Sequence, residues 1–245
     1  ILVPTLAGTV GCDYCFEDKR PVRLAPDDLP RLTKAILDHM EHVGAADAEV
    51  YWQGGEVLLL GPAWFETAHE VMGAAAAARG LGLHHSLQSN LIGYGSHWDP
   101  VIRTMFGGSV GTSMDVPNDH RRLKNGSTGR YTEVWLEAVA RAREAGLHVS
   151  AIAVVHAGTL RAGADAFLRF FSERARIGEV QVNLPFPGGP GRGGDTLAPE
   201  PLSRFLVALI DRWMSDYRER GFRLSPFNEL IDHFLGRPAR LPCIW

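Results

Sequence analysis

Two of the chain's three cysteines lie close together in the stretch VGCDYC, near the start of the sequence. Cys12 and Cys15 are separated by two residues, and a turn of that length points both sulfurs to one side, where they can chelate a soft metal or hold an edge of an iron–sulfur cluster. A zinc site would need two more cysteine or histidine ligands. Cys243 stands alone, however, and the adjacent His84 and His85 would point to opposite faces of a strand. A redox dithiol and a pair of structural thiols are the alternatives.

The stretch WQGGE is a second place where the residue types could bind a ligand. Gly54 and Gly55 would let a ligand approach the backbone closely, because neither residue carries a side chain. Gln53 precedes them, and the carboxylate of Glu56 beside them can accept hydrogen bonds from an ammonium group. A plain tight turn is the alternative explanation for the two glycines.

Polar residues also end two later apolar stretches. Ser113 and Asp115 are two residues apart, so both point to the same face of a strand, where a hydroxyl and a carboxylate suit a ribose or an amino-acid group. A simple cap at the end of the strand explains this pair equally well. Ser89 and Asn90 end the stretch LQSN in a similar position.

The elements that carry these clusters follow a regular alternation of apolar stretches and helical patterns. We predict strands over 1–7, 48–55, 83–90, 109–115, 147–156 and 179–186, and helices over 25–44, 62–80, 98–105, 130–146, 163–178 and 199–221. Strict alternation indicates parallel strands joined by right-handed crossovers, in a doubly wound sheet or a partial barrel. Barrels gather their chemistry at the carboxyl ends of the strands, so we expect all four clusters at one rim.

Length and composition limit the function classes. The chain has 245 residues and a formal net charge of −3, so no basic surface argues for nucleic acid. No apolar run approaches the roughly 20 residues of a membrane span. Three cysteines are too few for a disulfide framework and favour a reducing, cytoplasmic compartment. Ile1 inside an apolar run and Trp245 just after Cys243 suggest a piece of a longer protein.

Together these residues resemble the radical S-adenosylmethionine (SAM) superfamily. The core of that family is an α/β fold, a partial (β/α)6 TIM-like barrel, and its signature C-x3-C-x2-C holds a [4Fe–4S] cluster after the first strand. Cys12 and Cys15 match the second and third ligands, and Tyr14 matches the aromatic residue before the last. WQGGE resembles the family's GGEP motif, with Val57 in place of proline, and LQSN resembles its QTN motif.

The stretch GTSMDVPNDHRR resembles the S-x-D-G-P…H…R segment of the peptide- and protein-modifying branch, with Val116 in place of the glycine. In that branch the serine and a later basic residue hold the carboxylate or ribose of SAM. Ser113 matches the serine, and we choose Arg122 as the basic residue, with Arg121 and Lys124 as alternatives. The resemblance implies cofactor contacts at Tyr14, Gln53, Gly54, Gly55, Glu56, Ser89, Asn90, Ser113, Asp115, Arg122 and Val155.

The resemblance also implies a reaction and partners. Reductive cleavage of SAM would give a 5′-deoxyadenosyl radical that abstracts hydrogen from a peptide or protein, with a flavodoxin or ferredoxin as electron donor. The branch includes anaerobic sulfatase maturases, and many members carry a SPASM or twitch extension with auxiliary iron–sulfur clusters. We therefore expect the barrel over 1–221 and the start of such an extension over 222–245. Cys243 would be either a ligand of an auxiliary cluster or a plain buried thiol. No catalytic residue is identified.

The first ligand position of the signature, four residues before Cys12, is Gly8. Three explanations stay open. The ligand was lost, or a cysteine is missing from the sequence near position 8. In the third, His84, His85 or Cys243 supplies the remaining ligand. A degenerate, non-catalytic barrel that binds SAM or a peptide is the main alternative function. A thiol oxidoreductase is another, but it leaves WQGGE and SMDVPNDHRR unexplained.

Overall fold

The computed structural model describes residues 1–15, 17–124, 126–185 and 197–237, so Cys243 and its expected role in an auxiliary cluster lie outside the described residues. The chain divides into two units. The first consists of Ile1–Thr9, Glu17–Gly111 and Glu137–His148, and the second of Val10–Phe16, Thr112–Leu136 and Val149–Trp245.

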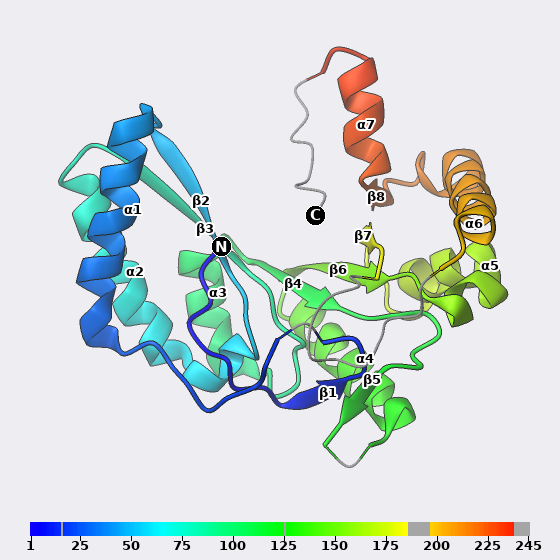
Figure 1. The fold of residues 1–245 in the computed structure, drawn as a ribbon, viewed down its shortest axis with the longest axis horizontal. Helices are drawn as coiled ribbons and strands as arrows, with labels where there is room; N and C mark the ends of the chain where they lie inside the picture. Colours follow the sequence, from blue (N-terminus) through cyan, green and yellow to red (C-terminus); the bar gives the residue numbers. More distant parts are fainter. Residues whose placement is uncertain (16, 125, 186–196, 238–245) are drawn as a thin grey trace. The chain divides into compact units, whose positions relative to one another are not determined.

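The first unit pairs β2 (Asp47–Trp52) with β3 (Gly82–Leu87) in parallel, and helices α1 (Leu29–Val43), α2 (Pro62–Ala77) and α3 (Asp99–Met105) follow the predicted alternation (Figure 1). Leu37 and Met40 of α1 pack with Ala76 of α2, and alanine and leucine side chains of β2 and β3 border this cluster. α1 ends at Gly44, whose φ of 69° is the left-handed conformation typical of a glycine that ends a helix. Both strands end about three residues earlier than predicted, so their polar clusters lie in the loops that follow.

The strand predicted over 1–7 is not a regular strand, and this prediction was wrong. Leu2 forms an isolated parallel bridge with Trp52, and Thr5 an isolated antiparallel bridge with Arg23. Pro4 between them has no amide hydrogen to donate, which interrupts a continuous ladder. The first strand is instead β1 (Val10–Cys12), which pairs antiparallel with β5 (Arg121–Leu123) in the second unit.

Four strands form the largest sheet, in the order β4 (Ser109–Ser113), β6 (His148–Val154), β7 (Glu179–Asn183) and β8 (Arg223–Ser225). β6 with β7 and β7 with β8 are parallel pairs, as the alternation predicts. The accompanying helices are α4 (Thr128–Glu144), α5 (Ala157–Arg169), α6 (Pro199–Arg212) and α7 (Phe227–Phe234). The sequence analysis did not predict β8, which is only three residues long. It also missed α7, although Phe227, Leu230, Ile231 and Phe234 follow the helical period, because residues 222–245 were assigned as a whole to the C-terminal extension.

α5 begins six residues before its predicted start at Gly163. His156 caps the helix: its Nδ1 accepts a hydrogen bond from the Gly158 amide at 3.1 Å. Gly163, with φ of 83°, interrupts the helix rather than starting it. On the buried face, the ring centres of Phe167 and Phe171 are 5.1 Å apart, and both side chains belong to the core.

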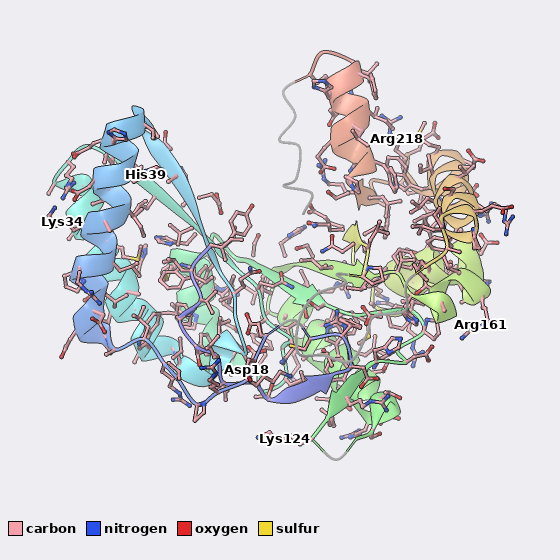
Figure 2. All side chains as sticks on the ribbon, in the orientation of Figure 1. Asp18, Lys34, His39, Lys124, Arg161 and Arg218 are labelled. Carbon is pink, nitrogen blue, oxygen red and sulfur yellow. The ribbon has the colours of Figure 1, made fainter. Side chains whose placement is uncertain are left out.

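Charged side chains lie on the outer surfaces of the helices. The exposed Lys34 of α1 and Arg161 of α5 point away from the strands (Figure 2). Within the part of the chain that the structure describes, no helix combines the length and the apolar character that crossing a membrane requires.

His85 in β3 gives the first unit a predicted dependence on pH. The buried indole of Trp52 donates its N–H to His85 Nδ1 at 3.1 Å, and a protonated ring cannot accept this bond. Burial lowers the pKa of His85 to about 4, and His69 and His84 act in the same direction. Because this folded-state pKa lies below the ordinary value of 6.5, the unfolded chain binds the proton first as the pH falls. We expect the free energy of unfolding to fall by about 1–3 kcal/mol between pH 6.5 and pH 4.

Urea unfolding at several pH values measures this dependence. His85→Gln is the matched control, since its side-chain oxygen can still accept the indole N–H but does not titrate in this range. The control should lose less stability on acidification than the unaltered chain. Equal losses in the two chains would assign the acid sensitivity to other groups.

Candidate functional site

The cysteine pair forms a tight turn at the end of β1. The Cys15 amide donates to the Cys12 carbonyl at 3.1 Å, and both side chains are half-buried and free of disulfides. Cys12 lies opposite Arg121 in the pairing of β1 with β5. The pairing with β5 therefore fixes the position of Cys12, where the turn begins. As the spacing predicted, both thiols lie on one short segment.

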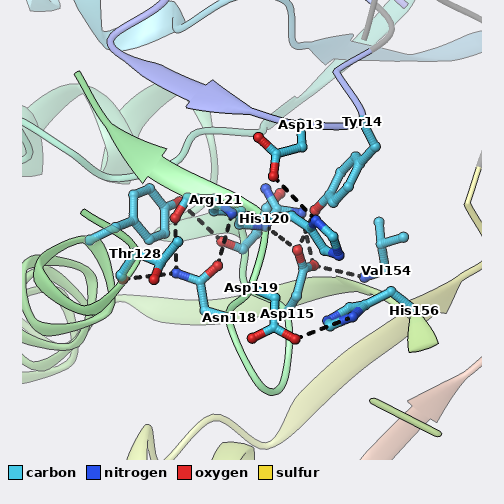
Figure 3. A network of polar contacts seen from close by, with 12 residues as sticks. Asp13, Tyr14, Asp115, Asn118, Asp119, His120, Arg121, Thr128, Val154 and His156 are labelled. Atoms are coloured by element: carbon cyan, nitrogen blue, oxygen red, sulfur yellow. Dashed lines mark hydrogen bonds and ion pairs between the residues drawn. The ribbon is translucent and has the colours of Figure 1, made fainter. Parts of the chain in front are cut away.

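A buried network joins this turn to two other segments of the second unit (Figure 3). Asp115 is 1% exposed, and its carboxylate accepts hydrogen bonds from Arg121 Nε at 3.0 Å and Arg121 Nη2 at 3.1 Å. The Val154 amide donates to it at 3.0 Å, and the Tyr14 hydroxyl donates to it as well. The Arg121 guanidinium also lies 5.5 Å from the centre of the Tyr14 ring. Protein donors therefore already engage both oxygens of Asp115, a residue predicted to contact the cofactor.

A second, more exposed network involves Asp13, which lies between the two cysteines. Arg122 donates to Asp13 Oδ1 at 3.1 Å and to Oδ2 at 2.8 Å, and the two side chains are 40% and 41% exposed. His120 Nδ1 lies 3.4 Å from the same carboxylate. The hydrogen bonds from Arg122 hold the pKa of Asp13 below its usual value. Arg122, predicted to hold the carboxylate or ribose of SAM, is thus paired with the thiol turn.

In the first unit, the backbone of residues 5–7 lies so close to WQGGE that both of its glycines are required. The Gly55 amide donates to the Thr5 carbonyl at 2.9 Å, and the Glu56 amide donates to the Ala7 carbonyl at 2.7 Å. A Cβ atom at Gly55 would lie 2.2 Å from the Ala7 carbonyl oxygen, and one at Gly54 would lie 2.5 Å from the Thr5 carbonyl oxygen. Packing against residues 5–7 is therefore sufficient to require glycine, and ligand contact by this turn stays a prediction.

Glu56 joins WQGGE to LQSN, as their shared placement predicted. Its carboxylate is 2% exposed and accepts from the Leu58 amide at 3.0 Å, the Ser89 hydroxyl at 2.7 Å and the Asn90 amide at 2.9 Å. Burial raises the pKa of Glu56, and these three donors oppose that rise. The Asn90 side chain donates a hydrogen bond from Nδ2 to Thr9 Oγ1 at 3.0 Å. The carboxylate thus holds the two loops together.

The predicted site residues fall into one group in each unit. The first unit holds Gln53, Gly54, Gly55, Glu56, Ser89 and Asn90, and the second holds Cys12, Tyr14, Cys15, Ser113, Asp115, Arg122 and Val155. Ser113 ends β4, where its carbonyl accepts the Tyr131 hydroxyl at 3.4 Å. Val155 is buried and its amide donates to the Asn183 carbonyl at 2.9 Å. The sequence missed Asp13 and the role of Arg121, although Asp13 lies within the cysteine motif itself.

The ligand set for an iron–sulfur cluster is incomplete in the described residues. No group of three histidine, cysteine, aspartate or glutamate residues that could hold a metal ion occurs among them. Gly8 has no donor atom, and a Cβ built on it would lie 3.0 Å from Lys19 Cδ. Two thiolates are fewer than the three that the predicted [4Fe–4S] site requires, so the described residues supply only part of that ligand set.

A sequence profile described as the Radical SAM superfamily matches residues 2–171. Among similar proteins, the serine-type anaerobic sulfatase-maturating enzyme of Klebsiella pneumoniae is 26% identical over 218 residues, which cover 84% of this chain and 53% of that enzyme. The cysteine-type anaerobic sulfatase-maturating enzyme of Clostridium perfringens (strain 13 / Type A) is 26% identical over 240 residues, which cover 92% of this chain and 62% of that enzyme. The chain therefore spans about half to three-fifths of the length of these curated relatives.

Solved structures share the fold. The structure titled "Native anSMEcpe with bound AdoMet and Kp18Cys peptide" matches with a TM-score of 0.79 at 20% identity, covering 97% of this chain and 66% of that one. The crystal structure of Streptococcus suis SuiB matches with a TM-score of 0.58 at 13% identity, covering 91% of this chain and 47% of that one. Together with the parallel strands and alternating helices, these matches confirm the predicted α/β class, a partial TIM-like barrel.

Proposed function

The chain belongs to the radical SAM superfamily, and from this membership we propose that it is the core of a radical SAM enzyme that modifies a peptide or protein. The profile match over residues 2–171 is the observation that carries the proposal. Two further observations support it: the curated relatives are sulfatase-maturating enzymes, and one structural relative holds AdoMet and a peptide. The activity of the whole protein and its substrate are part of the proposal, because the chain spans only part of those relatives.

The proposed cofactors are SAM and a [4Fe–4S] cluster, with Cys12 and Cys15 as two of the thiolate ligands. A chain with glycine at position 8 should hold such a cluster weakly, since these clusters normally take four ligands. The proposed SAM contacts are those implied by the resemblance: Tyr14, Gln53, Gly54, Gly55, Glu56, Ser89, Asn90, Ser113, Asp115, Arg122 and Val155. For Glu56 and Asp115 the contacts described above support an indirect part, in which each carboxylate orders the loops around it.

The remaining elements of the proposal concern location and partners. A cytoplasmic location follows from the sparse cysteines, and a flavodoxin or ferredoxin would serve as electron donor. The barrel would extend over 1–221, and 222–245 would lead into a SPASM or twitch extension with an auxiliary cluster. β8, at Arg223–Ser225, extends the sheet beyond that boundary.

Formation of 5′-deoxyadenosine tests the proposed chemistry. The chain and its Gly8→Cys variant are reconstituted anaerobically with iron and sulfide, then incubated with SAM and dithionite. We expect the variant to form 5′-deoxyadenosine and methionine in amounts that the chain with Gly8 does not reach. Adding Cys15→Ser to the variant removes one of its three thiolates and should abolish the product. A variant that binds the full complement of iron and still leaves SAM intact would contradict the proposal.

Gly8 itself favours a second candidate function, a non-catalytic barrel that binds SAM or a peptide. Calorimetric titration of the unaltered chain with SAM separates the two. Binding of SAM without 5′-deoxyadenosine formation, in the chain with Gly8 and in the Gly8→Cys variant alike, would favour the non-catalytic barrel.

A further inference from the structure

The Cys12–Cys15 turn is anchored through both of the residues between its cysteines. Tyr14 joins the buried Asp115–Arg121 pair, and Asp13 joins the partly exposed Arg122. Figure 3 shows both residues pointing from the turn toward the segment 115–122. The thiols therefore lie on a loop with two separate polar anchors, and these anchors differ in burial.

We infer that the buried Asp115–Arg121 pair is the positioning device of the thiol turn. Arg121 lies on β5, and Asp115 accepts hydrogen bonds from two further segments: from the Tyr14 hydroxyl on the turn and from the Val154 amide at the end of β6. Arg121 also lies directly opposite Cys12 in the strand pairing, so one residue aligns the thiol strand and neutralises Asp115. The role of the thiols as cluster ligands rests on the proposed function. Their positioning does not, because it is a property of the chain without metal.

Burial decides which anchor holds the turn. The Asp115 side chain is 0% exposed and that of Arg121 is 9% exposed, so neither charge has water as a replacement partner. Removing one of them leaves the other buried and uncompensated, which disrupts the local structure strongly. The Asp13–Arg122 pair is about two-fifths exposed, and such pairs contribute little because water and salt screen them. The first pair should therefore fix the turn, and the second should adjust it only slightly.

The turn offers its own reporter, because neither cysteine is in a disulfide and both thiols can be alkylated in the metal-free chain. Labelling with iodoacetamide, followed residue by residue with peptide mass spectrometry, measures how often the turn opens. In Asp115→Asn we expect Cys12 and Cys15 to react roughly tenfold faster than in the unaltered chain. Tyr14→Phe removes only the hydroxyl that joins the turn to the pair, and it should increase both rates several-fold.

Asp165→Asn is the matched control, since Asp165 pairs with Arg212 at 2.6 Å in the same unit and both side chains are largely exposed. Its labelling rates should equal those of the unaltered chain. Unchanged rates in a folded Asp115→Asn chain would overturn the inference. If Asp115→Asn does not fold, Tyr14→Phe decides, and unchanged rates in that variant would overturn it equally. No iron or SAM is present, so a failure here is separate from a failure to form 5′-deoxyadenosine.

Discussion

Gly8→Cys is expected to raise the iron bound after anaerobic reconstitution from a small fraction to about four atoms per chain. The substitution supplies a third thiolate at the position that completes C-x3-C-x2-C with Cys12 and Cys15. Iron and sulfide analysis measures the effect, together with the brown absorption of the cluster. Of the predicted changes this is the largest in relative terms, because it converts a two-thiolate site into a three-thiolate site.

The structure indicates that a side chain fits at position 8. A Cβ there would lie 3.0 Å from Cδ and 3.1 Å from Cε of Lys19, whose side chain is flexible and exposed. Lys19 can therefore move aside at little cost, and no backbone atom is in the way. The double variant Gly8→Cys, Lys19→Ala removes even this obstacle, and it should bind at least as much iron as the single variant.

Gly11→Cys is the matched control for the iron content. A Cβ at Gly11 meets nothing within 4 Å, so the variant adds one thiol to the same region without steric strain. Its spacing to Cys12 is wrong for the signature, and we expect little gain in iron. Equal iron in the Gly8→Cys and Gly11→Cys chains would mean that the added thiol binds iron unspecifically.

The sequence predicted the order of elements well because their signals are local. Helical spacing, Gly44 as a helix stop and apolar strands with polar ends are all visible within short windows. The grouping of WQGGE with LQSN followed from the rule that parallel strands end at one edge, and Glu56 provides that contact. These predictions needed no knowledge of which side chains meet.

Pairing partners that are far apart in the sequence leave no local trace, and this explains why β1 and β5 were not predicted. β1 and β5 are three residues each, with Cys12 opposite Arg121, and no apolar period marks either of them. The prediction for residues 1–7 failed for a different, local reason: the stretch is apolar like a strand, but Pro4 interrupts its ladder.

The two adjacent arginines illustrate the same limit at the site. Arg121 and Arg122 are equivalent in the sequence, and we chose Arg122 by its spacing alone. In β5 their side chains alternate, so Arg121 turns inward to the buried Asp115 and Arg122 turns outward to Asp13. The buried side of the network also involves Tyr14 and Val154, which lie far from β5 in the sequence, so no short window shows which of the two arginines is buried.

Glu56→Ala is expected to lower the free energy of unfolding by about 3–5 kcal/mol. The carboxylate accepts three hydrogen bonds in a nearly dry environment, from Leu58, Ser89 and Asn90. Alanine would leave these buried donors without a partner, and each such donor costs about 1–3 kcal/mol. The loss should appear in urea unfolding, and it should be accompanied by faster amide exchange at Asn90.

Glu49→Ala tests whether the number of buried donors causes this loss. Glu49 is half-buried in β2 and accepts a hydrogen bond from the Ser86 hydroxyl, on the neighbouring strand β3. A hydroxyl can turn to water when its acceptor is removed, whereas the fixed amides near Glu56 cannot. We therefore expect Glu49→Ala to cost about 1 kcal/mol or less. Comparable losses in the two variants would mean that Glu56 contributes through side-chain volume, and that the WQGGE and LQSN loops do not depend on its carboxylate.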